Sequence, residues 1–134
     1  MRRVQAVVLF SLFLGLSPSC RKFEVRISSP EEEATVAEQL VVQGNVSDAR
    51  AAVWVVVLNL DVPGEYWVQP QATVKADGTW TAEVYVGEPG EGDKGKRFLL
   101  MAIANPKQPL QSGDVLGGWP PAAAQSNILE VTRK

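Results

Sequence analysis

Residues 77–86 read Asp-Gly-Thr-Trp-Thr-Ala-Glu-Val-Tyr-Val, a turn signal followed by strict alternation of polar and apolar side chains. Asp-Gly favours a tight turn between antiparallel strands, because glycine adopts a positive φ without steric cost. After this turn the apolar residues, from Trp80 to Val86, fall on one face, since side chains alternate along a strand. The stretch therefore predicts a hairpin with Trp80 in the core.

The same period of two continues along the chain on both sides of this hairpin. Strands are predicted at residues 23–27, 40–46, 53–60, 66–69, 72–75, 79–86, 97–104 and 127–132. Two of them, 53–60 and 97–104, are apolar on both faces, so we expect each to be covered on both sides, with Trp54 buried in the core. Short strands without a long helical pattern predict an all-β fold, a single immunoglobulin-like antiparallel β-sandwich of seven to eight short strands.

Residues 105–126 form the longest stretch without a strand pattern, and they hold four prolines and three glycines. A connection of this length is uncommon inside a small domain. We expect it to lie across the outer face of the strands at 53–60 and 97–104, with Trp119 packed against them. The alternative is a binding loop that presents Trp119 to solvent.

The first twenty residues have the pattern of an export signal that ends on the only cysteine of the chain. Arg2 and Arg3 precede an apolar segment, residues 4–16, that is too short to span a bilayer as a helix. The small residues Ser17 and Ser19, with Cys20 directly after them, resemble the lipobox of bacterial lipoproteins, although leucine is more usual where Ser17 stands. Ordinary secretory cleavage near Ser19 and an uncleaved anchor are the alternatives.

The lipobox resemblance implies that residues 1–19 are a cleaved signal peptide and that Cys20 carries a diacylglycerol. Residues 20–22 would then be a lipidated stub and residues 23–134 the exported domain. The implied location is the bacterial cell envelope, with the membrane as a partner through the N-terminal lipid. Arg21 follows the cysteine where aspartate would favour the inner membrane, so we expect the outer membrane if the source has one.

A second resemblance covers residues 23–104. Ile27-Ser28-Ser29-Pro30, followed by Val42-Gln43-Gly44, is similar to the opening of bacterial immunoglobulin-like modules, in which I-x-x-P and V-x-G mark the first two strands. The later segments Trp54 to Val57, Asp77 to Trp80 and Gly95 to Phe98 are similar to the same modules. The resemblance implies a β-sandwich of the fibronectin-III-like kind, to which no activity is attached.

Composition excludes several classes of function. Without the signal peptide the chain keeps eleven basic and all fifteen acidic residues, a net charge of 11 − 15 = −4, and it has no basic stripe. We therefore expect no nucleic acid partner. The chain has no histidine, which rules out Ser-His-Asp triads and HExxH zinc sites. No cofactor and no catalytic residue are predicted, and the protein is not expected to be an enzyme.

Acidic residues in the predicted turns are the remaining candidates for a metal site or for acid–base chemistry. The set consists of Asp61, Glu65, Asp77, Glu88, Glu91 and Asp93. Their spacing matches no EF-hand, so calcium binding is a minor hypothesis and solvated, flexible turns are the main one. A small hydrolase that uses these carboxylates is the weakest functional hypothesis.

Aromatic residues are the candidates for ligand binding. Tyr66 and Trp67 lie beside Pro70 on a predicted edge strand, and Trp119 lies in the long loop, so each would be available to stack on a sugar or a peptide. The sequence thus favours a non-catalytic binding or spacer domain with a protein or glycan partner in the envelope. A carbohydrate-binding module that uses these aromatic residues is the alternative.

Overall fold

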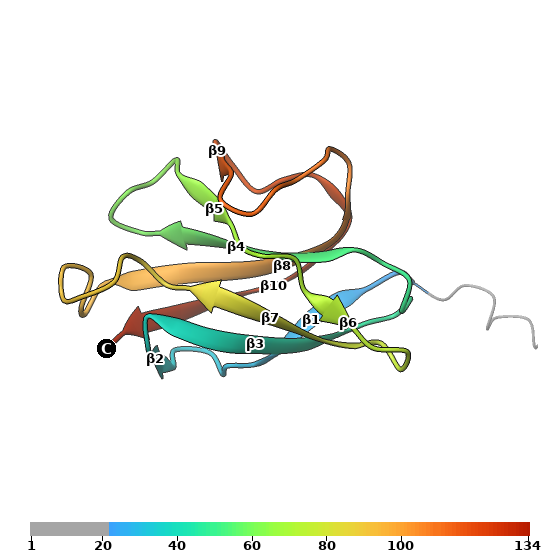
Figure 1. The fold of residues 1–134 in the computed structure, drawn as a ribbon, viewed down its shortest axis with the longest axis horizontal. Coiled ribbons are helices and arrows are strands. Elements are labelled where there is room, and N and C mark those ends of the chain that lie inside the picture. Colours follow the sequence, from blue (N-terminus) through green and yellow to red (C-terminus); the bar gives the residue numbers. More distant parts are fainter. Residues whose placement is uncertain (1–21) are drawn as a thin grey trace, which may run out of the picture.

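The computed structural model describes residues 22–134, which fold into two β-sheets packed face to face (Figure 1). The predicted signal peptide and Cys20 lie outside the described residues. The strands are β1 (Val25–Ser29), β2 (Thr35–Val36), β3 (Gln39–Val46), β4 (Val53–Asn59), β5 (Tyr66–Val68), β6 (Thr73–Val74), β7 (Thr79–Tyr85), β8 (Arg97–Pro106), β9 (Val115–Leu116) and β10 (Ala122–Arg133). No helix long and apolar enough to cross a membrane is found among residues 22–134.

The strand order is that of an immunoglobulin-like sandwich. One sheet has the order β1-β3-β7-β6 and the other the order β2-β10-β8-β4-β5-β9. The chain crosses between the sheets several times, for example from β3 to β4 and from β7 to β8, as in a Greek key. The fold class predicted from the sequence is confirmed. One detail is corrected, because β2 pairs with β10 in parallel and the sandwich is not wholly antiparallel.

The hairpin predicted from Asp77-Gly78 is present between β6 and β7. Gly78 has a φ of 90°, and its N–H donates to the carbonyl of Lys75 at 2.9 Å. The Asp77 carboxylate accepts a hydrogen bond from the Thr79 N–H at 2.9 Å and so closes the turn. The alternation along β7 is also confirmed, since Trp80, which is 1% exposed, and the apolar residues that follow it on the same face are buried.

Trp80 occupies the centre of the core between the sheets, directly opposite Gly44 on β3. A Cβ atom at Gly44 would collide with the indole ring of Trp80 and with the carbonyl oxygen of Arg26. Glycine is therefore required at this position so that the ring can lie over the neighbouring strand. The rest of the core is aliphatic apart from Phe98, and its fully buried members include Val42, Val53, Val55, Val84, Leu100 and Val131.

The region between β8 and β10 differs from the prediction. β8 continues to Pro106 and β10 begins at Ala122 rather than at residue 127, so the connection spans residues 107–121 instead of 105–126. It also contains β9, which the sequence did not predict and which pairs with β5. β2 was missed as well, so the described residues form ten strands rather than seven to eight. β2 and β9 have two residues each, too few to show a period.

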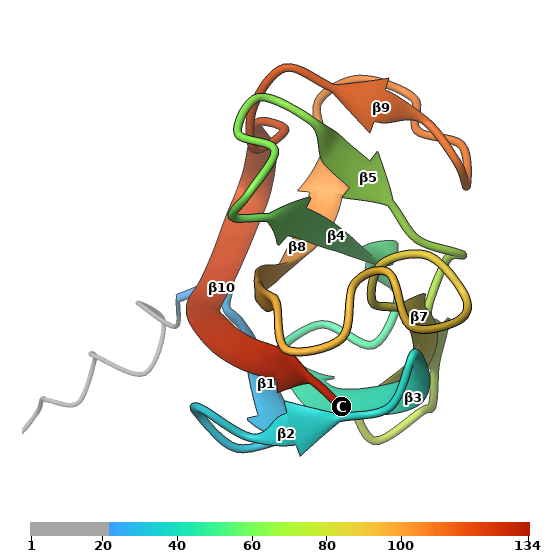
Figure 2. The ribbon, with the colours of Figure 1, turned by 90° about the vertical axis from the view of Figure 1, so that its left-hand side faces the viewer.

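The outer face of the six-stranded sheet is covered, as its apolar residues predicted. Val56, Val68, Met101 and Ile103 are buried although they do not belong to the core between the sheets. The connection 107–121, with β9 and β5, lies on the far side of β4 and β8 from the four-stranded sheet (Figures 1 and 2). We infer that this connection excludes water from the outer face.

The prediction that Trp54 is a core residue is wrong, because its side chain is only half-buried. On β4 it alternates with Val53 and Val55, which face the other sheet, so it points to the outer face. The apolar run 53–60 correctly indicated that both faces are apolar. A ring of this size is nevertheless not enclosed on the outer face, where the cover is one connection rather than a second sheet.

Candidate ligand-binding cleft

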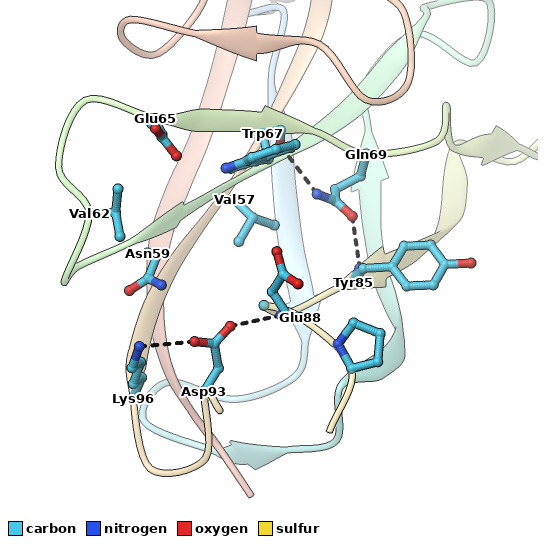
Figure 3. A pocket seen from close by; sticks show the side chains of 12 residues that line it. Val57, Asn59, Val62, Glu65, Trp67, Gln69, Tyr85, Glu88, Asp93 and Lys96 are labelled. Carbon is cyan, nitrogen blue, oxygen red and sulfur yellow. Dashed lines mark hydrogen bonds and ion pairs between the residues drawn. The ribbon is translucent and has the colours of Figure 1, made fainter. Parts of the chain in front are cut away.

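A cleft of about 470 Å³ opens between the two sheets at the β5 side of the sandwich (Figure 3). The end of β4, the following loop and β5 form one wall, and the loop 87–96 forms the opposite wall. Val57 and Trp67 supply its apolar surface, and Glu65, Glu88 and the Asp93–Lys96 pair supply its charged surface. The lining thus combines an exposed tryptophan with charged side chains.

The cleft exists because the two sheets differ in width. Trp67 lies opposite Val57 in the β4–β5 ladder, so its side chain points toward the four-stranded sheet. That sheet ends there in β6, which has two residues and pairs only with Trp80 and Thr81. No strand therefore covers Trp67 among the described residues, and 43% of its surface is exposed. In Figure 3 its ring lies across one side of the cleft, above Val57.

Gln69 holds the two sheets together beside the cleft. Its Oε1 atom accepts a hydrogen bond from the Tyr85 N–H at 2.8 Å, and its Nε2 atom donates to the Trp67 carbonyl at 3.3 Å (Figure 3). Gln69 is 5% exposed, so these bonds satisfy an amide that would otherwise be costly to bury. The Tyr85 ring is exposed and points away from Trp67, so it does not form a second stacking surface in the cleft.

The loop 87–96 contains a buried carboxylate, which the interpretation of its acidic residues as solvated did not predict. The carboxylate of Asp93 is buried, where it accepts a hydrogen bond from the Glu88 N–H at 2.7 Å and pairs with the Lys96 ammonium at 3.0 Å. These two contacts hold the pKa of Asp93 below its usual value, the hydrogen bond from Glu88 being the larger cause. Gly87 allows this arrangement, because a Cβ there would lie 2.8 Å from the Phe98 ring.

Arg133 fixes the same loop from behind. It is 3% exposed, and its guanidinium donates to the carbonyl oxygens of Val86 and Glu88 at 2.8 Å and to the carbonyl of Gly90. It also meets the Glu38 carboxylate at 3.4 Å. The end of β10 therefore anchors the loop that carries Glu88, and the backbone that presents this carboxylate to the cleft is held in place.

The structure separates the three aromatic residues that the sequence proposed as a ligand site. Tyr66 and Trp119 stack edge to face, with ring centroids 4.8 Å apart, and both are partly buried. Trp67 lies on the opposite face of β5, because adjacent residues of a strand point in opposite directions. Tyr66 and Trp119 thus belong to the cover of the outer face, and Trp67 alone lines the cleft.

The acidic turn residues are also divided. Glu65, Glu88 and Asp93 lie in the cleft lining, whereas Asp61, Asp77 and Glu91 do not. The Asp77 carboxylate accepts hydrogen bonds from the N–H and the hydroxyl of Thr79, which lower the pKa of Asp77. Within the part of the chain that the structure describes, no group of three acidic, cysteine or histidine side chains is arranged to hold a metal ion.

Sequence reasoning missed that Glu65, Trp67 and Glu88 share one cleft. Glu65 and Trp67 are two residues apart on one face of an extended segment, which the sequence could have shown. Glu88 reaches them only because the chain crosses between the sheets, and no local pattern records that. A scan against models of known protein families and a search of curated proteins each found no match to this chain.

Proposed function

We propose that the protein is a lipid-anchored, extracytoplasmic domain of the bacterial cell envelope that binds a ligand without catalysis in the cleft beside Trp67. It does not act on nucleic acid and needs no cofactor. The resemblance of residues 23–104 to exported bacterial immunoglobulin-like modules supports the same kind of role. If the source has an outer membrane, the protein resides there.

The observation that carries the binding function is the exposure of Trp67. Large aromatic side chains at 43% exposure leave apolar surface in water, and such surface in a concave site is typical of ligand binding. The cleft is also preformed, since Gln69 and Arg133 fix its two walls through buried hydrogen bonds. A preformed site loses little conformational entropy on binding.

The chemistry of the lining supports binding rather than catalysis. Glu65 and Glu88 are both exposed to solvent, whereas a carboxylic acid that donates a proton at neutral pH needs a desolvated environment. The buried carboxyl, Asp93, is held in its ionised form by Glu88 and Lys96. The hydrolase hypothesis therefore lacks a general acid among these three groups.

The proposed location in the cell envelope is supported by the sequence of the first twenty residues. The charged start, the short apolar segment and Cys20 after small residues together make up the lipoprotein signal. A diacylglycerol joined to the Cys20 sulfur at the new N-terminus would tether the sandwich to a membrane, since two or more acyl chains hold far more strongly than one.

Carbohydrate binding is the second candidate, because an exposed indole can stack on a sugar ring. The exposed Trp67 favours it. Tyr66 and Trp119 do not extend the stacking surface, because they are stacked on each other at the outer face.

A ligand titration of the full chain in a non-ionic detergent tests the binding function. The indole N–H signals of the tryptophans are followed by NMR while simple sugars, organic cations and short alcohols are added. We expect a binding compound to shift the Trp67 signal and to leave Trp80, which is 1% exposed, unchanged. If no compound in the panel moves Trp67, the domain is a spacer and the binding function is wrong.

A further inference from the structure

We propose that the ligand of this cleft is an organic cation, an alkylammonium or guanidinium group held between the Trp67 ring and the carboxylates of Glu65 and Glu88. This inference rests on the proposed function and names the class of ligand. It follows from the negative charge of the lining, from the exposed indole and from the hydrogen bonds that the neutral amides already make.

The lining has an excess of negative charge. It contains three carboxylates, Glu65, Glu88 and Asp93, and one ammonium, Lys96, which leaves a formal charge of −2. Lys96 pairs with Asp93 at 3.0 Å, and among residues 22–134 neither Glu65 nor Glu88 takes part in an ion pair. A concave wall with one sign of charge attracts the opposite sign. The cleft is therefore complementary to a cation.

The apolar part of the lining fits a weakly hydrated cation better than a metal ion. The face of an indole attracts ammonium and guanidinium groups more strongly than the other aromatic rings do. Trp67 and Val57 lie on the same face of neighbouring strands, so a group that reaches Trp67 also contacts an aliphatic surface. Alkylated ammonium and guanidinium groups are more weakly hydrated than a metal ion, which also needs several oxygen ligands.

Most of the amide atoms in the cleft are already hydrogen-bonded within the protein. Both ends of the Gln69 amide are bonded to the main chain, and the Asn59 Oδ1 atom accepts a hydrogen bond from the Asp61 N–H at 2.9 Å. Few amide groups remain to recognise the hydroxyls of a sugar, which sites of that kind fix with hydrogen bonds. The carboxylates of Glu65 and Glu88 are therefore the main polar groups available to select a ligand.

A matched pair of probes tests the charge requirement directly. Choline and 3,3-dimethylbutan-1-ol have the same shape and differ in the positive charge, and ethylguanidinium supplies the second cationic group. Each is titrated into the full chain in non-ionic detergent while the Trp67 indole signal, assigned with Trp67→Phe, is recorded. We expect choline or ethylguanidinium to shift this signal saturably and the neutral alcohol to bind at least tenfold more weakly.

Substitutions locate the site. Trp67→Ala removes the indole signal, so its binding is measured by calorimetry, and it should be weaker by roughly tenfold. Glu88→Gln should weaken binding by about threefold and make it less sensitive to salt. Glu91→Gln, in the same loop but outside the cleft lining, is the matched control and should bind like the wild type. The unchanged Trp80 signal in each variant would show that the fold is retained.

The outcomes separate this inference from the proposed function. If the neutral alcohol or a sugar shifts Trp67 as readily as choline does, the cation inference is wrong and the binding cleft stands. If Glu88→Gln and Glu91→Gln behave alike, the carboxylates do not select the ligand, and the inference is again wrong. If no probe of either kind moves Trp67, both proposals are contradicted.

Discussion

At the scale of single residues, one feature of the core and one of the loop 87–96 are expected to contribute to stability. Gly44 leaves room for the Trp80 ring, and Asp93 joins Glu88 to Lys96 inside the loop 87–96. Neither contact is visible in the local sequence, because each pairs residues from different strands or from the two ends of a loop. Each of these two contacts leads to a prediction about the stability of the fold.

Replacing Gly44 by alanine should destabilise the protein by about 3 kcal/mol, because the added methyl group collides with the Arg26 carbonyl and the Trp80 ring, and a packed core accommodates little extra volume. Urea denaturation of the two proteins measures the difference. Gly92→Ala is the control, since a Cβ at Gly92 has nothing within 4 Å. Equal losses in the two variants would contradict this account of the core.

The contacts of Asp93, first the hydrogen bond from the Glu88 N–H and then the Lys96 ion pair, predict a dependence of stability on pH. Because the pKa of Asp93 is lower in the folded chain than in the unfolded one, its contribution is present above about pH 4 and is lost as the pH falls toward the folded value. Asp93→Asn should therefore lower stability at neutral pH and reduce the loss between about pH 5 and pH 3. Denaturation midpoints across this range provide the test, and Glu91→Gln should keep the wild-type slope.

Residue burial could be predicted from the sequence where alternation was unambiguous. Trp80 follows a clear turn in a strand with a polar outer face, and its position in the core was predicted correctly. Trp54 lies in a run that is apolar on both faces, so the period could not say which face it occupies or how well that face is covered. The required glycine at position 44 and the buried Arg133 depend on non-local neighbours and were not predictable.

At the scale of elements, the connection 107–121 acts as a partial third layer. β9 pairs with the edge strand β5, and Trp119 stacks on Tyr66, so the connection is attached to the sheet that it covers. Val56 and Ile103 on the outer face are fully buried, and we infer that the connection shields them. The proline- and glycine-rich composition allowed this path without allowing its two-residue strand to be predicted.

Trp119→Ala should cost about 2 kcal/mol of folding stability, less than a fully buried aromatic residue because Trp119 is half-buried. Trp67→Ala should change stability by less than about 1 kcal/mol, as is typical of exposed positions. Chemical denaturation of both variants makes the comparison. If Trp67→Ala is the more destabilising, the assignment of one ring to the cover and the other to the cleft is wrong.

The boundaries of β10 show why elements are harder to predict than the fold class. Ala122 to Gln125 extend the ladder with β8, but the register shifts between Gln125 and Ile128, so the alternation is interrupted. The Ser126 hydroxyl fills this irregularity by accepting a hydrogen bond from the Ala102 N–H at 2.8 Å. A period broken in this way reads as loop in the sequence, although the strand is continuous.

At the scale of the whole molecule, the unequal widths of the two sheets create the cleft. The six-stranded sheet extends past the four-stranded one, and the loop 87–96 closes the gap only in part. The fold class could be predicted from the series of short strands in the sequence. The width of each sheet could not, because it depends on which strands pair, and contacts between distant residues decide the pairing. The cleft could therefore not be predicted from sequence patterns, whereas the proposed location in the cell envelope is based on residues 1–20 alone.

The lipid-anchored state is tested most directly by fractionating cells that express the wild type or Cys20→Ser, with the mass of the purified chain measured in each fraction. We predict wild-type protein in the membrane fraction with an acylated Cys20 as its first residue, and Cys20→Ser protein out of the membrane fraction. Wild-type protein that is already soluble, or that carries an unmodified Cys20, would contradict the account.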